Sequence, residues 1–232
     1  MTDGASVPEQ DVRAALATVR DPELDRPITD LDFVSELSVA GPRVRVRLRL
    51  PTYFCAPNFA YLMVSDAYDA VAALPGVTEV DVRLDDHFAS EEINAGVAAR
   101  SGFAGSFPGQ AEEELEDLRR TFQRKAHTAC LERTCRRLID AGWQIDALPE
   151  VHLADVPDSP ERETLMRRRA DLGLPTGPDA PLMVDDDGTP VAADQVAARL
   201  RFAKAVRVSI DGNAGWCGGL LQTRYGMTEE VR

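Results

Sequence analysis

The chain has 232 residues, 44% of them hydrophobic and 28% charged, which suits a packed globular protein and excludes global disorder. A formal net charge of −13 argues against nucleic acid or an anionic membrane as the main partner. No apolar run reaches the roughly 20 residues that a membrane-spanning helix needs, and the first ten residues lack the features of a signal peptide. We therefore expect a cytoplasmic protein whose four cysteines are reduced thiols.

The first 85 residues predict a compact α+β unit in the order helix, strand, strand, helix, strand. Apolar residues at spacings of three and four indicate the helices, and alternation of apolar and polar residues indicates the strands. The second strand turns four arginines to one face, and acidic residues of the third strand can lie across from them. The predicted elements are a helix that begins at Ser6 and ends near Asp21, strands over 33–39 and 43–50, a helix over 58–74 and a strand over 77–84.

The second half of the chain is predicted to be largely helical. We therefore expect two domains, a small α+β domain over 1–100 and a mostly helical extension over 101–232 that ends in a Gly-rich loop. The elements expected here are helices over 88–100, 110–141, 159–172 and 193–204, a short strand over 206–210, and the Gly-rich loop Asp211–Gly219.

Cys55 is the first candidate site residue, because it lies in a short loop just ahead of the predicted helix 58–74. A helix N-terminus presents free backbone N–H groups and the positive end of the helix dipole. Such a setting favours the thiolate, the form that binds metals and attacks electrophiles. The alternative is that Cys55 is a small buried hydrophobic residue.

Three further residues could complete a site with Cys55. Cys217 lies in the predicted Gly-rich loop, which can form an anion nest or an ordinary turn, and it is the favoured partner. His127 and Cys130 lie about 60° and 4.5 Å apart on the predicted long helix, so one metal ion can reach both. Helix packing is the alternative for this pair. Cys135 lies on another face of that helix and is set aside.

Acidic residues supply two more candidates. His87 stands among four acidic residues between positions 85 and 92, and oxygen and imidazole donors suit iron, manganese or zinc. A solvated loop at a helix start would explain the same cluster. Asp21 and Glu23 flank Pro22, where they can terminate the first helix or take part in a site.

The order and spacing of several short motifs resemble the iron–sulfur cluster assembly domain family, which includes the bacterial SUF-associated T protein and the phenylacetate-oxygenase D protein. The resemblance implies a role in maturing or repairing iron–sulfur or other iron proteins, with Cys55 as the functional cysteine and Asp21 and Glu23 as the acidic turn. The matching motifs are Asp21-Pro22-Glu23, Thr29-Asp30-Leu31, Phe33-Val34, Leu50-Pro51-Thr52 with Cys55, and Leu74-Pro75-Gly76-Val77.

Two features depart from the minimal family. Ala56 separates the cysteine from Pro57, and the bulky pair Tyr53-Phe54 precedes it, which suggests a shielded site. The long C-terminal half resembles the extended form found alongside bacterial diiron monooxygenases. That likeness implies a dedicated maturation factor whose client is an oxygenase subunit.

Three functions follow, and the first is favoured. The protein is expected to bind iron or an iron–sulfur cluster through Cys55 and to pass it to a client metalloenzyme, acting as an assembly factor rather than a catalyst. The second function is a metal-free chaperone for an oxygenase subunit. The third is a thiol enzyme with Cys55 or Cys217 as nucleophile and His87 or His127 as base. The oligomeric state stays open.

Overall fold

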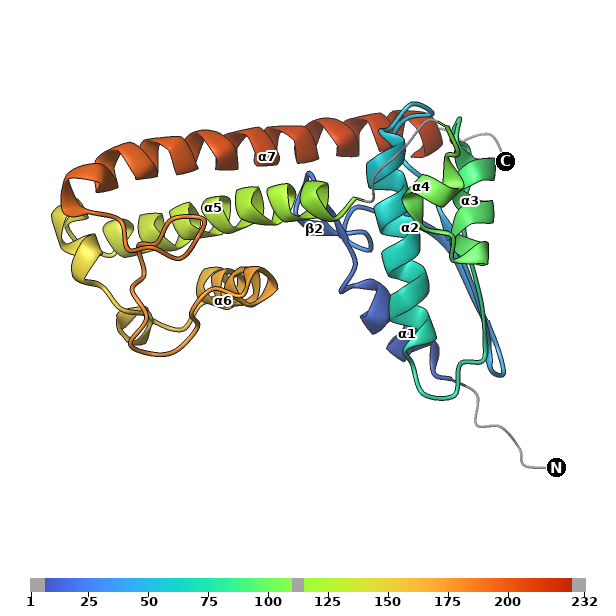
Figure 1. The fold of residues 1–232 in the computed structure, drawn as a ribbon, viewed down its shortest axis with the longest axis horizontal. Helices are drawn as coiled ribbons and strands as arrows, with labels where there is room; N and C mark the ends of the chain where they lie inside the picture. The colour runs from blue at the N-terminus through green and yellow to red at the C-terminus, as the bar shows by residue number, and fades with distance from the viewer. Residues whose placement is uncertain (1–6, 110–114, 227–232) are drawn as a thin grey trace. The chain divides into compact units, whose positions relative to one another are not determined.

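The computed structural model describes residues 7–109 and 115–226, and these form two compact units (Figure 1). Unit 1 contains the described residues of Met1–Glu116 and Asn213–Arg232, and unit 2 contains Asp117–Gly212. The last part of the chain, which we assigned to the extension, is thus grouped with unit 1 by its contacts. No helix in the described part of the chain is long and apolar enough to cross a membrane.

A three-stranded sheet in the order β3-β4-β5 forms the centre of unit 1. Strands β3 and β4 are antiparallel and joined at Gly41, whose φ of 63° is a left-handed conformation that glycine adopts without strain. Strands β4 and β5 are parallel, so the chain crosses between them through helix α2. The predicted helix, strand, strand, helix and strand are confirmed, but the first helix ends at Leu16 rather than near Asp21, which lies in the short strand Arg20–Asp21. The bounds are β3 Val34–Ala40, β4 Arg43–Leu48, α2 Pro57–Ala72 and β5 Glu79–Leu84.

The arginine face of β4 pairs with acidic residues of β5, as predicted. Arg43 lies 2.7 Å from Glu79, and Arg45 lies 3.3 Å from Asp81, in the parallel register of the two strands. Both pairs are largely exposed, so each stabilises the fold by about 1 kcal/mol at most. They fix the polarity of this face and leave the opposite face of the sheet to the core.

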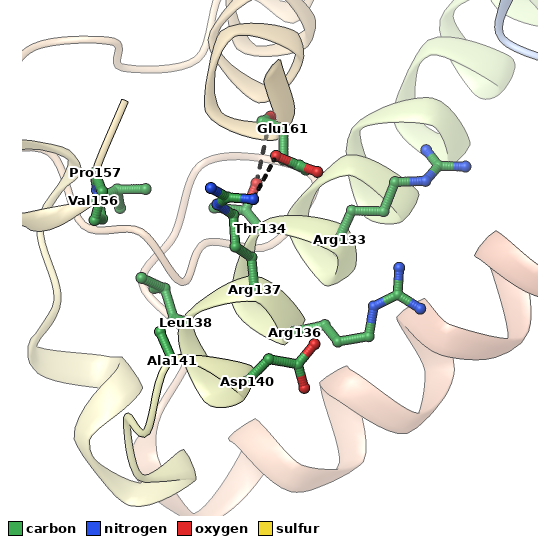
Figure 2. A pocket seen from close by; sticks show the side chains of 10 residues that line it. All are labelled: Arg133, Thr134, Arg136, Arg137, Leu138, Asp140, Ala141, Val156, Pro157 and Glu161. Atoms are coloured by element: carbon green, nitrogen blue, oxygen red, sulfur yellow. Dashed lines mark hydrogen bonds and ion pairs between the residues drawn. The ribbon is translucent and has the colours of Figure 1, made fainter. Parts of the chain in front are cut away.

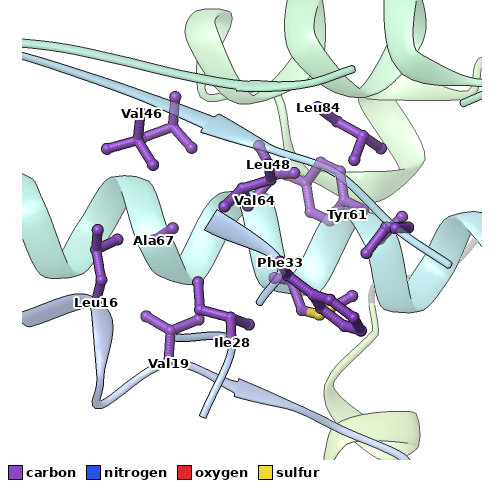
Figure 3. Packing of buried hydrophobic residues seen from close by; sticks show 14 of the residues in the cluster. Leu16, Val19, Ile28, Phe33, Val46, Leu48, Tyr61, Val64, Ala67 and Leu84 are labelled. Atoms are coloured by element: carbon purple, nitrogen blue, oxygen red, sulfur yellow. The ribbon is translucent and has the colours of Figure 1, made fainter. Parts of the chain in front are cut away.

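The core of unit 1 lies between the apolar face of the sheet and helices α1, α2 and α3. Figure 3 shows Val46 and Leu48 of β4 turned toward Val64 and Ala67 of α2. All four side chains are buried, and removal of this apolar surface from water is the main force holding the unit together. The remaining elements of unit 1 are α1 Glu9–Leu16, β1 Arg20–Asp21, β2 Arg26–Pro27, α3 Ser90–Ala99 and α4 Gly102–Ser106.

Unit 2 has a core of its own, built from helices and short 3-10 turns. Arg169 is fully buried there and donates hydrogen bonds to the carbonyls of Pro175, Pro181 and Leu182, which holds that loop against its helix. The helix predicted over 159–172 is confirmed, and the helix predicted over 110–141 is confirmed for Glu116–Asp140, while residues 110–114 lie outside the described residues. The elements are α5 Glu116–Asp140, α6 Pro160–Leu172, 3-10 turns at Ile145–Glu150, Leu153–Asp155 and Ala193–Gln195, and the first part of α7 Val196–Tyr225.

The predicted strand over 206–210 and the predicted loop Asp211–Gly219 are wrong, because both lie inside helix α7. Each glycine lowers helix stability by about 1 kcal/mol relative to alanine. Tertiary packing offsets that cost, since Ala214 and Leu221 are buried in the core of unit 1. The short alternation of valines favoured a strand locally, but the packing of the whole helix stabilises the helical conformation instead.

Candidate functional site

Cys55 lies at the end of the loop that leads into α2, immediately before the N-cap residue Ala56. Its side chain is half-buried, and its Sγ lies 3.4 Å from the hydroxyl oxygen of Thr52. The same hydroxyl accepts a hydrogen bond from the backbone N–H of Phe54. Thr52 therefore holds the loop in a tight turn with the thiol on its inner side.

His87 fixes the cysteine loop from a second direction. Its Nδ1 accepts a hydrogen bond from the N–H of Ala89 at 3.2 Å, so the ring proton is on Nε2. Nε2 donates to the carbonyl oxygen of Cys55 at 2.7 Å. Burial lowers the pKa of His87 and so favours the neutral ring, while the hydrogen bond to Cys55 acts in the opposite direction. Both ring nitrogens are thus engaged, and His87 positions the Cys55 backbone.

The acidic turn holds a buried carboxylate. Asp21 ends β1, and its Oδ1 accepts hydrogen bonds from the N–H groups of Glu23 and Leu24 at 2.9 and 2.8 Å. Burial raises the pKa of Asp21 to about 6, while these two hydrogen bonds oppose the rise and the charge of Glu23 adds to it. At neutral pH the turn therefore keeps a negative charge in a place that water barely reaches.

Cys217 lies on the same part of the molecule as this turn and the cysteine loop. It is half-buried on α7 and packs, like Cys55, on the core of unit 1. Burial raises the pKa of Cys217 to about 11, and the negative charges of Asp21 and Glu23 raise it further. Because such effects fall with distance, Asp21, Glu23 and Cys55 lie near enough to Cys217 to influence its thiol. Cys55 and Cys217 also pack on the same core.

Two residues of α7 that the sequence did not single out tie the helix to this region. Asn213, one turn before Cys217, donates to the carboxylate of Glu23 at 3.2 Å. Arg224 donates to the carbonyls of Leu50 and Asp86 at 3.1 and 2.6 Å. Asn213, Cys217 and Arg224 share one helix face, a spacing that becomes visible once the segment is known to be helical.

The donors predicted on the long helix belong to the other unit. His127 is fully buried in unit 2, and neither ring nitrogen has a hydrogen-bond partner among the described residues. Burial lowers the pKa of His127 to about 4, with the charge of Arg169 as a further cause. Cys130 is buried in the same unit, so a shared site of this pair with Cys55 stays a prediction.

The donor set near Cys55 is small. Among residues 7–109 and 115–226, no three side chains of His, Cys, Asp or Glu are grouped closely enough to hold one metal ion. Cys55 and Cys217 thus offer two thiols. An iron–sulfur cluster takes thiolates at four positions. The described residues of this region therefore supply fewer thiols than a complete cluster takes.

Unit 2 also has a surface pocket of about 540 Å³ between α5 and α6 (Figure 2). In it, Arg137 pairs with Glu161 at 3.7 Å, and the Thr134 hydroxyl donates to the backbone carbonyl of Glu161. None of the predicted site residues lines it. It is therefore a feature separate from the cysteine region.

Comparison with known proteins matches the part of the chain that contains Asp21, Glu23 and Cys55. The family described as iron-sulfur cluster assembly protein matches residues 9–82. An iron-sulfur cluster carrier protein of Synechocystis sp. is 34% identical over 73 residues, which are 32% of this chain and 20% of that protein. An uncharacterized protein of Methanocaldococcus jannaschii is 32% identical over 89 residues, which are 38% of this chain and 92% of that protein. Through residues 9–82 the chain belongs to the iron–sulfur cluster assembly protein family.

Proposed function

We propose that the protein carries iron or an iron–sulfur cluster as cargo at Cys55 and Cys217 and delivers it to a client metalloenzyme. The observation that carries the proposal is that Cys55 and Cys217, from distant parts of the sequence, pack on one core in a chain of the iron–sulfur cluster assembly family. Thiolates are the usual protein ligands of such clusters.

The electrostatic setting favours a cationic cargo. The sequence of unit 1 includes 11 Lys and Arg against 23 Asp and Glu, and that of unit 2 includes 15 against 16. Without metal, the Cys217 thiol stays protonated because burial and the neighbouring carboxylates of Asp21 and Glu23 oppose its ionisation. A bound iron ion stabilises the thiolate, so iron binding releases protons and the affinity for iron increases as the pH rises.

A two-thiol site also suits transfer. Few ligands have to exchange when the cargo moves to a client. Thr52 and His87 hold the Cys55 loop in place during this exchange. Following the extended form that the C-terminal half resembles, we propose that the client is an oxygenase subunit and that transfer takes place in the cytoplasm, where thiols stay reduced.

The metal-free chaperone is the second candidate, and the small donor set near Cys55 favours it. The thiol enzyme has less support. The raised pKa of Cys217 disfavours a nucleophilic thiolate, and His87 uses both ring nitrogens for structural hydrogen bonds.

Anaerobic reconstitution with iron and sulfide separates these functions. Wild type should bind iron and sulfide and develop a cluster absorption band, whereas Cys55→Ala and Cys217→Ala should each lose at least nine-tenths of the bound iron. Cys135→Ala is the matched control, because that thiol is buried against Met183 in unit 2. Equal iron content in wild type and Cys55→Ala would refute the proposal and favour the chaperone.

A further inference from the structure

The surface pocket of unit 2 between α5 and α6 has the size of a small-molecule site. Its volume is about 540 Å³, within the roughly 300 to 1,000 Å³ of ligand pockets in proteins. The last turns of α5, the first turn of α6 and residues 156–157 ahead of α6 form its walls. All of these lie outside residues 9–82, so the family match does not account for the pocket.

The pocket has an apolar side and a basic side. Figure 2 shows Leu138, Val156 and Pro157 on one side and the guanidinium groups of Arg133 and Arg136 on the other. Leu138 and Val156 are buried residues of the unit 2 core, so the apolar side is part of a packed wall. A ligand that spans the pocket meets apolar surface at one end and positive charge at the other.

Two of the three guanidinium groups in the pocket have unused hydrogen-bond donors. Arg133 is paired with Asp211 at 2.7 Å. Arg137 lies 3.7 Å from a carboxylate oxygen of Glu161, which is an ion pair too long for a hydrogen bond. Among residues 7–109 and 115–226, the side chain of Arg136 has no hydrogen bond or ion pair. Guanidinium groups with free donors bind carboxylate or phosphate oxygens in pairs.

The charges around the pocket favour an anion. Its lining contains three arginines against two carboxylates, those of Asp140 and Glu161. Helix α6 begins at Pro160 and adds the positive end of its dipole. The alternative role for the arginines is to stabilise the negative C-terminal end of α5. The two roles predict different results when the arginines are replaced.

We propose that this pocket binds a small organic anion, a carboxylate or phosphate borne on an apolar body. The oxyanion accepts hydrogen bonds from Arg136 and Arg137, and the apolar body lies against Leu138 and Val156. Glu161 releases Arg137 as the ligand binds, because no hydrogen bond joins the two side chains. The inference goes beyond the proposed function and involves no metal cargo.

The test is an NMR titration of the full metal-free chain with four probes: phenyl phosphate, benzoate, benzamide and inorganic phosphate. Phenyl phosphate and benzoate should each bind with a Kd of about 1 mM or lower and shift the amide signals of the pocket walls. Benzamide lacks the charge and inorganic phosphate lacks the apolar body. Each of these two should therefore bind at least about tenfold more weakly. The order of the first two identifies the preferred oxyanion.

Substitutions in the lining test both sides of the pocket. Arg136→Gln and Arg137→Gln should each weaken the binding of phenyl phosphate at least about tenfold. Ala141→Phe should prevent binding, because Ala141 is an exposed lining residue whose enlargement fills the apolar side without entering the core. Arg167→Gln is the matched control, since Arg167 is exposed on α6 and does not line the pocket. Urea unfolding checks that all four variants are folded.

Each other outcome would overturn the inference. The absence of shifts with either organic anion at about 10 mM would exclude the site. Benzamide binding as tight as that of benzoate would exclude the role of the arginines. Lower stability with unchanged affinity in both arginine variants would show that they serve the end of α5. A hexaglutamate peptide that binds more tightly than phenyl phosphate would point to an acidic protein segment instead. Iron binding is measured separately, so none of these results decides the proposed function.

Discussion

The two units place their cysteines in opposite settings. In unit 1, Cys55 and Cys217 are half-buried beside acidic residues and next to exposed aromatic rings. In unit 2, Cys135 is fully buried with its sulfur 3.4 Å from that of Met183, and burial raises its pKa to about 12. Access and neighbouring charge, rather than the number of thiols, therefore decide which cysteines can handle a metal.

The largest effect is expected from removing Arg169, the buried charged residue that stabilises unit 2. Arg169→Ala removes three hydrogen bonds and leaves the carbonyls of Pro175, Pro181 and Leu182 without their donor. We expect a loss of about 3 to 5 kcal/mol in the free energy of unfolding of unit 2. Hydrogen exchange should show lost protection in unit 2 and retained protection in the sheet of unit 1. Arg167→Ala, an exposed residue of the same helix, should have little effect, and equal losses in both units would contradict the comparison.

The second prediction concerns the acidic turn of unit 1. The pKa of Asp21 is about 6 in the folded state against 3.8 ordinarily, so the folded state binds more protons between these values. Its contribution to stability is greatest below about pH 4 and is lost as the pH rises through 6. Asp21→Asn keeps the acceptor oxygen. At pH 8 it should raise the free energy of unfolding by up to about 3 kcal/mol, measured by urea unfolding, and at pH 4 it should leave that free energy unchanged.

That stabilisation should be accompanied by weaker iron binding, because the negative charge beside Cys217 is gone. Exposed Asp30→Asn is the control and should change neither property. If Asp21→Asn were less stable than wild type at pH 8, the carboxylate would be supporting the fold rather than opposing it.

The third prediction compares the thiols of the two units directly. In the metal-free protein, alkylation of Cys217 by iodoacetamide should speed up about tenfold per pH unit from pH 7 to 10, because its pKa is about 11. Glu23→Gln should increase the rate at pH 8 by removing a nearby negative charge. Peptide mapping should find Cys135 unmodified in the same samples. A Cys217 rate that stops rising below pH 9 would rule out the proposed setting.

The smallest effect concerns the glycines of α7. A side chain built at Gly215 or Gly218 would meet no other atom within 4 Å, so packing in the chain itself does not require glycine there. Gly215→Ala and Gly218→Ala should each raise the free energy of unfolding by about 0.5 to 1 kcal/mol. Destabilisation by either change, measured in urea, would show that the helix is not formed as described.

Local patterns predicted much of unit 1 and little of what completes it. Alternation identified β4 and β5 and the Arg43–Glu79 pairing, because the side chains of a half-buried strand alternate between core and solvent. The short alternation and glycines around Cys217 suggested a strand and a loop. The contacts that make this segment helical join residues far apart in the sequence, such as Asn213 and Glu23, and no local spacing encodes them.

Helix α7 contributes its residues up to Gly212 to unit 2 and those from Asn213 on to unit 1. Unit 1 is therefore interrupted in the sequence by the whole of unit 2. During synthesis the ribosome releases Asp21, Glu23 and Cys55 first, and Cys217 emerges only after about 160 further residues, which include the whole of unit 2. The nascent chain consequently cannot pack Cys217 on the core of unit 1 until the whole of unit 2 has been made.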